Sequence, residues 1–78
     1  MKRIWFIVNP ISGTHDKKGI VAKIPEYFPE CRFATEIKYT EYSGHAAEIA
    51  RMAVEQGVDI VVAIGGDGTV NETARALI

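Results

Sequence analysis

The sequence predicts an α/β fold in which an open parallel sheet lies between two layers of helices. The expected strands 3–8 and 60–64 contain continuous apolar runs rich in β-branched residues, which is typical of strands that are covered on both faces. Segments with helical features alternate with the expected strands, in the order strand, helix, strand, helix, strand, helix. This βαβαβα order predicts right-handed crossovers, and therefore a three-layer α/β/α arrangement.

Length and composition limit the classes of protein to which the chain can belong. Its 78 residues are enough for one small domain, and 47% apolar and 24% charged residues are ordinary for a globular protein. The net charge is −1 and the basic residues are scattered, so nucleic-acid binding is not expected. The lone Cys31 excludes an internal disulfide, which fits a reducing, cytoplasmic compartment. No apolar run approaches the roughly 20 residues that cross a bilayer, so membrane contact is expected only at the surface.

The first half of the chain is expected to form a buried strand, a helix and a half-exposed strand. After the strand 3–8, turn-forming residues at 9–13 interrupt the pattern, and Asp16 is placed to cap a helix over 17–28. Residues 32–39 then alternate between polar and apolar, as in a strand with one exposed face. This strand is expected at an edge of the sheet.

The second half is expected to form a helix, a central strand and a second helix. Gly57 is a natural stop for the first of these helices, and the apolar run 60–64 predicts a central parallel strand. From about Val70 onward a helix is favoured, with Glu72 near its N-terminus, where the helix dipole favours an acid. Because the chain ends inside this helix, we expect it to be part of a longer protein. The apolar stripe of the first helix comprises Ala46, Ile49, Ala50, Ala53 and Val54.

The strongest functional signal is the segment 65–72, Gly-Gly-Asp-Gly-Thr-Val-Asn-Glu, between a buried strand and a helix. Its glycines permit positive φ angles and let backbone N–H groups approach a phosphate, and the helix N-terminus behind them favours anions. Asp67 would repel phosphates unless it holds a cation or orients a hydroxyl or ribose. A tight turn in which Asp67 caps the helix is therefore an alternative. The general dinucleotide and P-loop fingerprints are absent, since position 71 is Asn instead of Gly and no Gly-Lys-Ser/Thr occurs.

This segment resembles the signature of the diacylglycerol kinase catalytic domain family, which includes sphingosine and ceramide kinases. NAD kinases and phosphofructokinases have similar loops of the GGDGT type. The extension by Asn71-Glu72 favours the lipid kinases.

Two further blocks resemble the same family and stand in its order and spacing. Residues 9–13, Asn-Pro-Ile-Ser-Gly, look like the N-P-x-S-G loop after the family's first strand. Thr40, followed four residues later by Gly44-His45-Ala46, is similar to the family's T-x-x-x-G-[DH]-A segment. Taken alone, the first block could be a simple Asn-Pro turn and Thr40 a strand-end residue. His45 is expected to be exposed and without a chemical role.

The resemblance implies that residues 1–78 form the N-terminal, nucleotide-binding lobe of an NAD kinase/diacylglycerol kinase-like fold, with ATP and Mg²⁺ as cofactors. The intact enzyme would transfer the γ-phosphoryl group of ATP to a lipid hydroxyl, such as that of diacylglycerol, mainly by positioning and charge stabilisation. Asp67 is the catalytic candidate. The residues expected to bind the nucleotide are Asn9, Pro10, Ser12, Gly13, Thr40, Gly65, Gly66, Asp67, Gly68, Thr69, Val70, Asn71 and Glu72.

The resemblance also implies partners and leaves other functions open. A C-terminal β-rich lobe, expected beyond residue 78, would supply most lipid contacts, the magnesium-binding acids and the general base, so this part alone is expected to be inactive. The expected partners are ATP, a lipid alcohol, a membrane surface and, through an exposed sheet edge, a second copy of the chain. An NAD kinase-like enzyme and a non-catalytic nucleotide-binding module are the alternatives.

Overall fold

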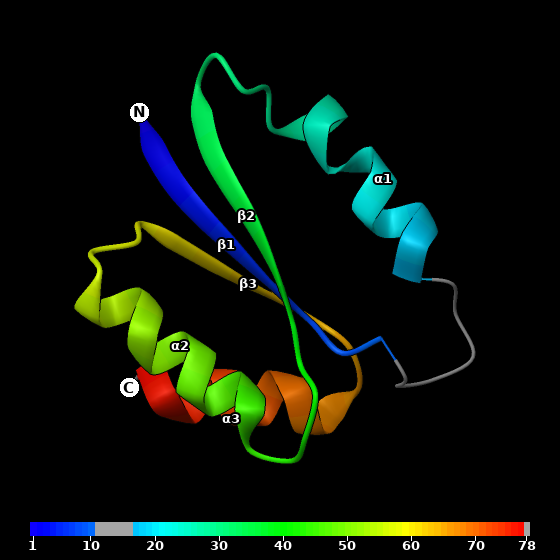
Figure 1. The fold of residues 1–78 in the computed structure, drawn as a ribbon, viewed down its shortest axis with the longest axis vertical. Coiled ribbons are helices and arrows are strands. Elements are labelled where there is room, and N and C mark those ends of the chain that lie inside the picture. The colour runs from blue at the N-terminus through cyan, green and yellow to red at the C-terminus, as the bar shows by residue number, and fades with distance from the viewer. Residues whose placement is uncertain (11–16, 78) are drawn as a thin grey trace.

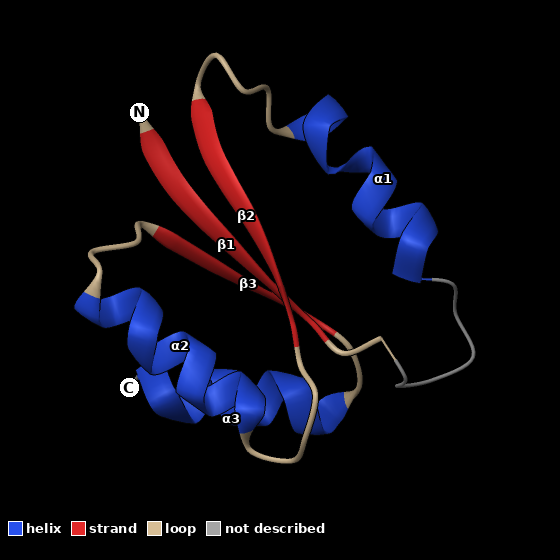
Figure 2. Cartoon of the chain, viewed as in Figure 1, coloured by secondary structure: helices blue, strands red, loops and turns tan. Residues whose placement is uncertain are grey.

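The computed structural model describes residues 1–10 and 17–77, which form a parallel sheet with helices on both sides (Figures 1 and 2). The order of elements confirms the predicted alternation of strands and helices. None of the described helices has the length and apolar character needed to span a bilayer. The elements are β1 (Lys2–Val8), α1 (Lys17–Tyr27), β2 (Phe33–Tyr39), α2 (His45–Glu55), β3 (Ile60–Ile64) and α3 (Asp67–Leu77).

The three strands run parallel in the order β2-β1-β3, so that β1 is central. Phe6 of β1 lies in register with Ile37 of β2 on one side and Val62 of β3 on the other. The connection from β1 to β2 and the connection from β2 to β3 cross the sheet in opposite directions. Crossovers of one hand therefore place their helices on opposite faces. Figure 1 shows α1 on one side of the sheet and α2 beside α3 on the other, which confirms the three-layer prediction.

β1 supplies the core of both faces, because successive side chains of a strand point to opposite sides of the sheet. Residues 4–8 are each at most 3% exposed, which explains their unbroken apolar run. The core toward α1 contains Ile4, Phe6, Val8 and Ile24, and the core toward α2 contains Trp5, Ile7, Ala46, Ile49, Ala50 and Ala53.

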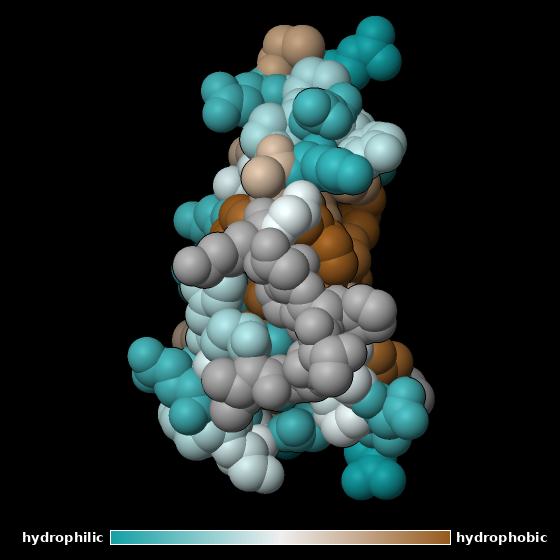
Figure 3. All heavy atoms as spheres, turned by 90° about the vertical axis from the view of Figure 1, so that its right-hand side faces the viewer, coloured by the Kyte–Doolittle hydropathy of each residue, from teal (hydrophilic) through white to brown (hydrophobic). Residues whose placement is uncertain are grey.

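Both outer strands of the described sheet are edge strands, although the sequence predicted only β2 at an edge. The prediction of a central position for 60–64 is wrong for the described residues, because an apolar run reports two covered faces and not two neighbouring strands. The coverage of β3 is also incomplete, since Ile60 is 38% exposed. Figure 3, viewed from the side of α1, shows apolar atoms at the surface on this side of the molecule.

Helices α1 and α2 occupy nearly their predicted ranges. Gly57 follows the end of α2 and has φ 72°. Its N–H donates to the carbonyl of Val54 at 3.1 Å, and the N–H of Val58 donates to the carbonyl of Ala53 at 2.9 Å. This is the expected glycine stop. Val54 is 60% exposed and does not belong to the buried stripe, because it lies about 100° around the helix from Ala53. Asp16, the predicted cap of α1, lies outside the described residues.

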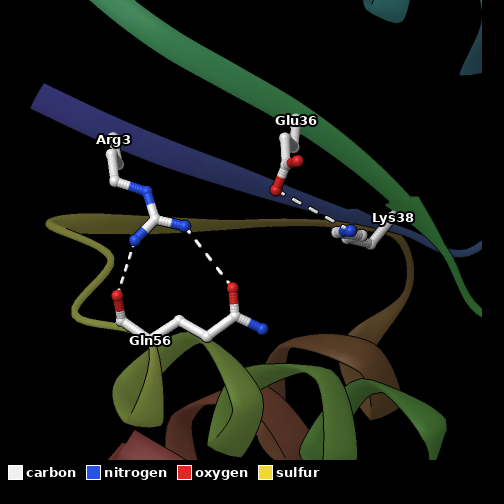
Figure 4. A network of polar contacts seen from close by, with 4 residues as sticks. All are labelled: Arg3, Glu36, Lys38 and Gln56. Atoms are coloured by element: carbon white, nitrogen blue, oxygen red, sulfur yellow. Dashed lines mark hydrogen bonds and ion pairs between the residues drawn. The ribbon is translucent and has the colours of Figure 1, made fainter.

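A polar network secures the amino ends of the strands (Figure 4). The Arg3 guanidinium donates to the backbone carbonyl and the side-chain oxygen of Gln56 at 2.5 and 3.5 Å. The Arg3 backbone N–H donates to the Asp59 carboxylate at 2.8 Å. A separate ion pair joins Nζ of Lys38 to Oε2 of Glu36 at 3.7 Å. Because both side chains are exposed, this pair contributes little stability. The Arg3 contacts join β1 to the α2–β3 turn, at the amino ends of β1 and β3.

Candidate functional site

The carboxyl ends of β1, β2 and β3 meet at one edge of the sheet. The backbone N–H of Asn9, just after β1, donates to the carbonyl of Ile64 at the end of β3, at 3.0 Å. The N–H of Thr40, just after β2, donates to the carbonyl of Val8 at 2.8 Å. The described parts of the three predicted sequence blocks are therefore brought together by the topology.

A pocket of about 270 Å³ opens at this edge, between the end of β1, the β2–α2 loop and the first turns of α3. β1 and β3 are neighbours, and the helices that follow them lie on opposite faces of the sheet. Such a switch point is where open α/β sheets bind their ligands. The described residues that line the pocket are Asn9, Thr40, Glu41, Tyr42, Ser43, Ala46, Gly68, Thr69 and Glu72.

The glycine segment is more helical than the sequence predicted. α3 begins at Asp67, three residues before the predicted start at Val70, so Gly68 lies in its first turn. Among the described residues only Gly44 and Gly57 have positive φ, so the glycines of the segment 65–68 do not use the positive φ angles that they permit. The glycine at position 65 is required by close packing instead. A Cβ there would lie 2.9 Å from Oγ1 of Thr69.

Gly68 opens space in the pocket. Apart from its chain neighbours and the backbone of its own helix, a Cβ at this position would meet no atom of residues 1–10 and 17–77 within 4 Å, and the residue lines the pocket. The first turn of α3 directs backbone N–H groups that have no partner inside the helix toward its N-terminal side, where the helix dipole is positive. This end of the pocket has the chemistry to bind a phosphate group.

Thr69 anchors the start of α3 against the sheet. Its side chain is 5% exposed and contacts Gly65. Its carbonyl accepts the hydroxyl of Thr73, which is also buried, at 2.8 Å. The helix that carries the glycines is thereby held close to the strand end.

The β2–α2 loop is ordered by its own side chains. Nδ1 of His45 accepts the backbone N–H of Glu41 at 2.9 Å, and its ring stacks on that of Tyr42 with centroids 4.3 Å apart. The Tyr42 hydroxyl donates to the Glu48 carboxylate, and this hydrogen bond raises the pKa of the phenol. His45 is half-buried and holds the loop, so the prediction that it would be exposed is wrong.

Glu72 links α3 to the same loop. Its Oε1 accepts the backbone N–H of Gly44 at 2.6 Å. Gly44 is the N-cap of α2, with φ 89° and no side-chain hydrogen bond to cap the helix. The two walls of the pocket are thus joined by one carboxylate.

The structure brings together part of the predicted site. Asn9, Thr40, Gly68, Thr69 and Glu72 line the pocket together. Gly65 lies close to Thr69 and does not line the pocket. Five other predicted residues are exposed and do not line it either: Pro10, Gly66, Asp67, Val70 and Asn71. Ser12 and Gly13 lie outside the described residues.

Sequence reasoning missed four lining residues, Glu41, Tyr42, Ser43 and Ala46. The first three occupy the variable positions between Thr40 and Gly44, which the family pattern leaves open. Their position inside a recognised block was the only signal available.

Asp67, the predicted catalytic residue, is the exposed first residue of α3. A carboxylate there interacts favourably with the helix dipole. Among residues 1–10 and 17–77, no group of three or more His, Cys, Asp or Glu could hold a metal ion.

Comparison with known proteins places this geometry in one family. Residues 3–78 match the diacylglycerol kinase catalytic domain. The chain is 35% identical over 77 residues to a diacylglycerol kinase of Bacillus subtilis, covering 99% of this chain and 25% of that protein. It is also 35% identical over 77 residues to sphingoid long chain base kinase 5 of Saccharomyces cerevisiae, covering 97% of this chain and 11% of the relative.

A solved structure agrees with the sequence relatives. The crystal structure of a diacylglycerol kinase from Bacillus anthracis superposes with a TM-score of 0.77 at 28% identity, covering 96% of this chain and 27% of that one. This chain thus spans about a quarter of the length of these bacterial relatives. The parallel sheet, the order of the three blocks and the match over nearly every residue agree, and the chain belongs to the diacylglycerol kinase catalytic domain family.

Proposed function

We propose that this chain binds ATP at the carboxyl-edge pocket and forms the nucleotide-binding lobe of a lipid kinase. The whole protein would transfer the γ-phosphoryl group of ATP to a lipid hydroxyl, such as that of diacylglycerol. The observation that carries the proposal is the convergence of Asn9, Thr40 and Gly68, one from each sequence block, on a single pocket. The kinase relatives support the reaction class.

The start of α3 and the Glu41 carboxylate favour one orientation of the nucleotide, while the other carboxylate that lines the pocket, Glu72, accepts the Gly44 N–H. The N-terminus of α3 and the open space at Gly68 favour phosphates at that end. The β2–α2 loop contributes Glu41, whose carboxylate repels phosphates and can accept hydrogen bonds from ribose hydroxyls or a base amino group. We therefore place the phosphates near Gly68 and the nucleoside near residues 40–43.

Mg²⁺ would accompany the phosphates and neutralise their charge when bound. Asp67 adjoins Gly68 at the start of α3, and an exposed carboxylate in that place can contact a phosphate-bound cation. We assign it this role. The general base, further metal ligands and most lipid contacts would belong to other parts of the whole protein.

Calorimetric titration of the chain with ATP and Mg²⁺ tests the proposal. Gly68→Val places a branched side chain in the space assigned to phosphate, so affinity should fall at least about tenfold, or roughly 1.4 kcal/mol. Gly19→Val is the matched control, because Gly19 also lies early in a helix, is exposed, and an added Cβ there would meet no other part of the described chain within 4 Å.

Saturable binding by the wild type and Gly19→Val, with weak binding by Gly68→Val, would support the proposal. A chain that is folded by circular dichroism and binds no ATP would contradict it. Equal affinity in the two variants would show that the nucleotide does not enter the space at Gly68.

A further inference from the structure

The contact between Glu72 and Gly44 joins two walls of the pocket that are 28 residues apart in sequence. Glu72 lies on the second turn of α3, and Gly44 begins α2. The N···O distance of 2.6 Å is short for a hydrogen bond from a backbone amide, as expected when the acceptor is a carboxylate. Both groups are partly buried, so water competes less for them than at an open surface.

The Gly44 N–H needs an acceptor from outside α2. Gly44 is the N-cap of α2, and the side chain that can accept the N–H of an N-cap residue is a Glu or Gln three positions later, where this chain has Ala47. The Glu72 carboxylate reaches this helix N-terminus from α3 and also interacts favourably with its dipole. A residue of α3 therefore supplies the acceptor that α2 does not provide.

The consequence for the pocket follows from what surrounds Gly44. Thr40 and Tyr42, which precede it, and Ala46, which follows it in the first turn of α2, all line the pocket. Fixing Gly44 therefore fixes this wall relative to Gly68 and Thr69 on α3. Sequence reasoning assigned Glu72 directly to the nucleotide, whereas its Oε1 accepts a backbone N–H of the opposite wall.

We propose that Glu72 is a positioning residue, which holds the β2–α2 loop in place through the Gly44 N–H and acts on the nucleotide only through that loop. The effect on the nucleotide rests on the proposed function. The positioning itself does not, because the contact joins two groups of this chain.

The first experiment measures the Gly44 amide by NMR in the absence of nucleotide. Glu72→Ala should speed its hydrogen exchange at least about tenfold and move its proton resonance upfield, because the charged acceptor is lost. Glu72→Gln keeps an acceptor oxygen without the charge and should restore most of the protection. Glu55→Ala, which removes an exposed carboxylate at the other end of α2, should leave the Gly44 amide unchanged.

The second experiment compares ATP affinity in a double-mutant cycle of Glu72→Ala and Thr40→Ala. If Glu72 acts through the loop that carries Thr40, both substitutions disturb the same contact with ATP. The fold-loss of ATP affinity in the double variant should then be clearly smaller than the product of the two single fold-losses. Glu72→Gln should bind ATP nearly as well as the wild type.

The outcomes separate the two proposals. A Gly44 amide that does not respond to Glu72→Ala would overturn the positioning role. If the losses of ATP affinity in Glu72→Ala and Thr40→Ala multiply in the double variant, the two residues act independently. Glu72 would then be a direct ligand, and the positioning role would also be overturned. A wild-type chain that binds no ATP would refute the proposed function, while the Gly44 amide would still decide whether Glu72 positions the loop. Glu72→Gln keeps these tests interpretable if Glu72→Ala fails to fold.

Discussion

At the scale of single residues, the glycines that identify the family have different physical roles. Gly65 and Gly68 are three positions apart, yet one faces packed atoms and the other faces open space. The sequence predicted that both would serve a phosphate through their backbone freedom. It could not distinguish them, because the difference depends on where Thr69 and Asn9 lie after folding.

This difference predicts opposite effects of the same substitution on stability. In Gly65→Ala the new Cβ would lie 2.9 Å from Oγ1 and 3.1 Å from Cβ of the buried Thr69, so we expect a loss of about 1–3 kcal/mol in the free energy of unfolding. The Cβ of Gly68→Ala would meet no other described residue and would replace a helical glycine, so this variant should be neutral or more stable by up to about 1 kcal/mol. Urea denaturation of both variants measures this, and equal effects would refute the packing role of Gly65.

Tyr42 makes a second prediction at this scale. Its hydrogen bond to Glu48 favours the neutral phenol, so the pKa of Tyr42 lies above 10.0. The difference between the phenolate absorbance titrations of the wild type and Tyr42→Phe should therefore have its midpoint above that value. Because the folded pKa is raised, the contribution of this contact to stability is complete below the ordinary pKa and is lost as pH rises through the folded value. A midpoint at or below 10.0 would contradict the contact.

At the scale of elements, the helix α2 shows how closely the layers approach. Its buried face consists of Ala46, Ile49, Ala50 and Ala53, and three small residues among four allow the helix to lie close to β1. The spacing of these residues was visible in the sequence. The extent of the buried face could not be predicted from the sequence, because Val54 is apolar and yet exposed.

Enlarging this face should therefore be costly. Ala53 is fully buried, so Ala53→Leu is expected to destabilise the chain by about 1–3 kcal/mol through overpacking. Val54→Leu, on the neighbouring exposed position, should change stability by less than about 0.5 kcal/mol. Thermal denaturation of the two variants compares them directly. A tolerated Ala53→Leu would mean that α2 is not closely packed on the sheet.

The element boundaries were less accessible to sequence reasoning than the elements themselves. The start of α3 was predicted at Val70 because glycines argue against helix, whereas the first turn of a helix tolerates Gly68. The position of β3 was predicted as central because its side chains are apolar. Strand order depends on which strands pair, and the sequence alone carries little of that information.

At the scale of the whole molecule, the alternation of elements and the three-layer arrangement were predictable, because hydrophobic periodicity reports them directly. The three sequence blocks were also recognisable. The pocket was predicted only in part, since Glu41 and Tyr42 follow no residue pattern and enter it through the path of the β2–α2 loop. The contact between Glu72 and Gly44 likewise exists only in three dimensions.

The pairing of the central strand has a consequence for how the molecule is made. Ile4 near the start of β1 lies beside Ile60 of β3, so the pairing of these strands joins residues that are far apart in the sequence. Such contacts slow folding, because a long stretch of chain must be ordered before they form. During synthesis, β1 and β2 can emerge and pair early, but the pocket cannot exist until β3 and α3 have left the ribosome. During that interval the edge of β1 that β3 covers is unpaired, and an unpaired strand edge is prone to pairing with other chains.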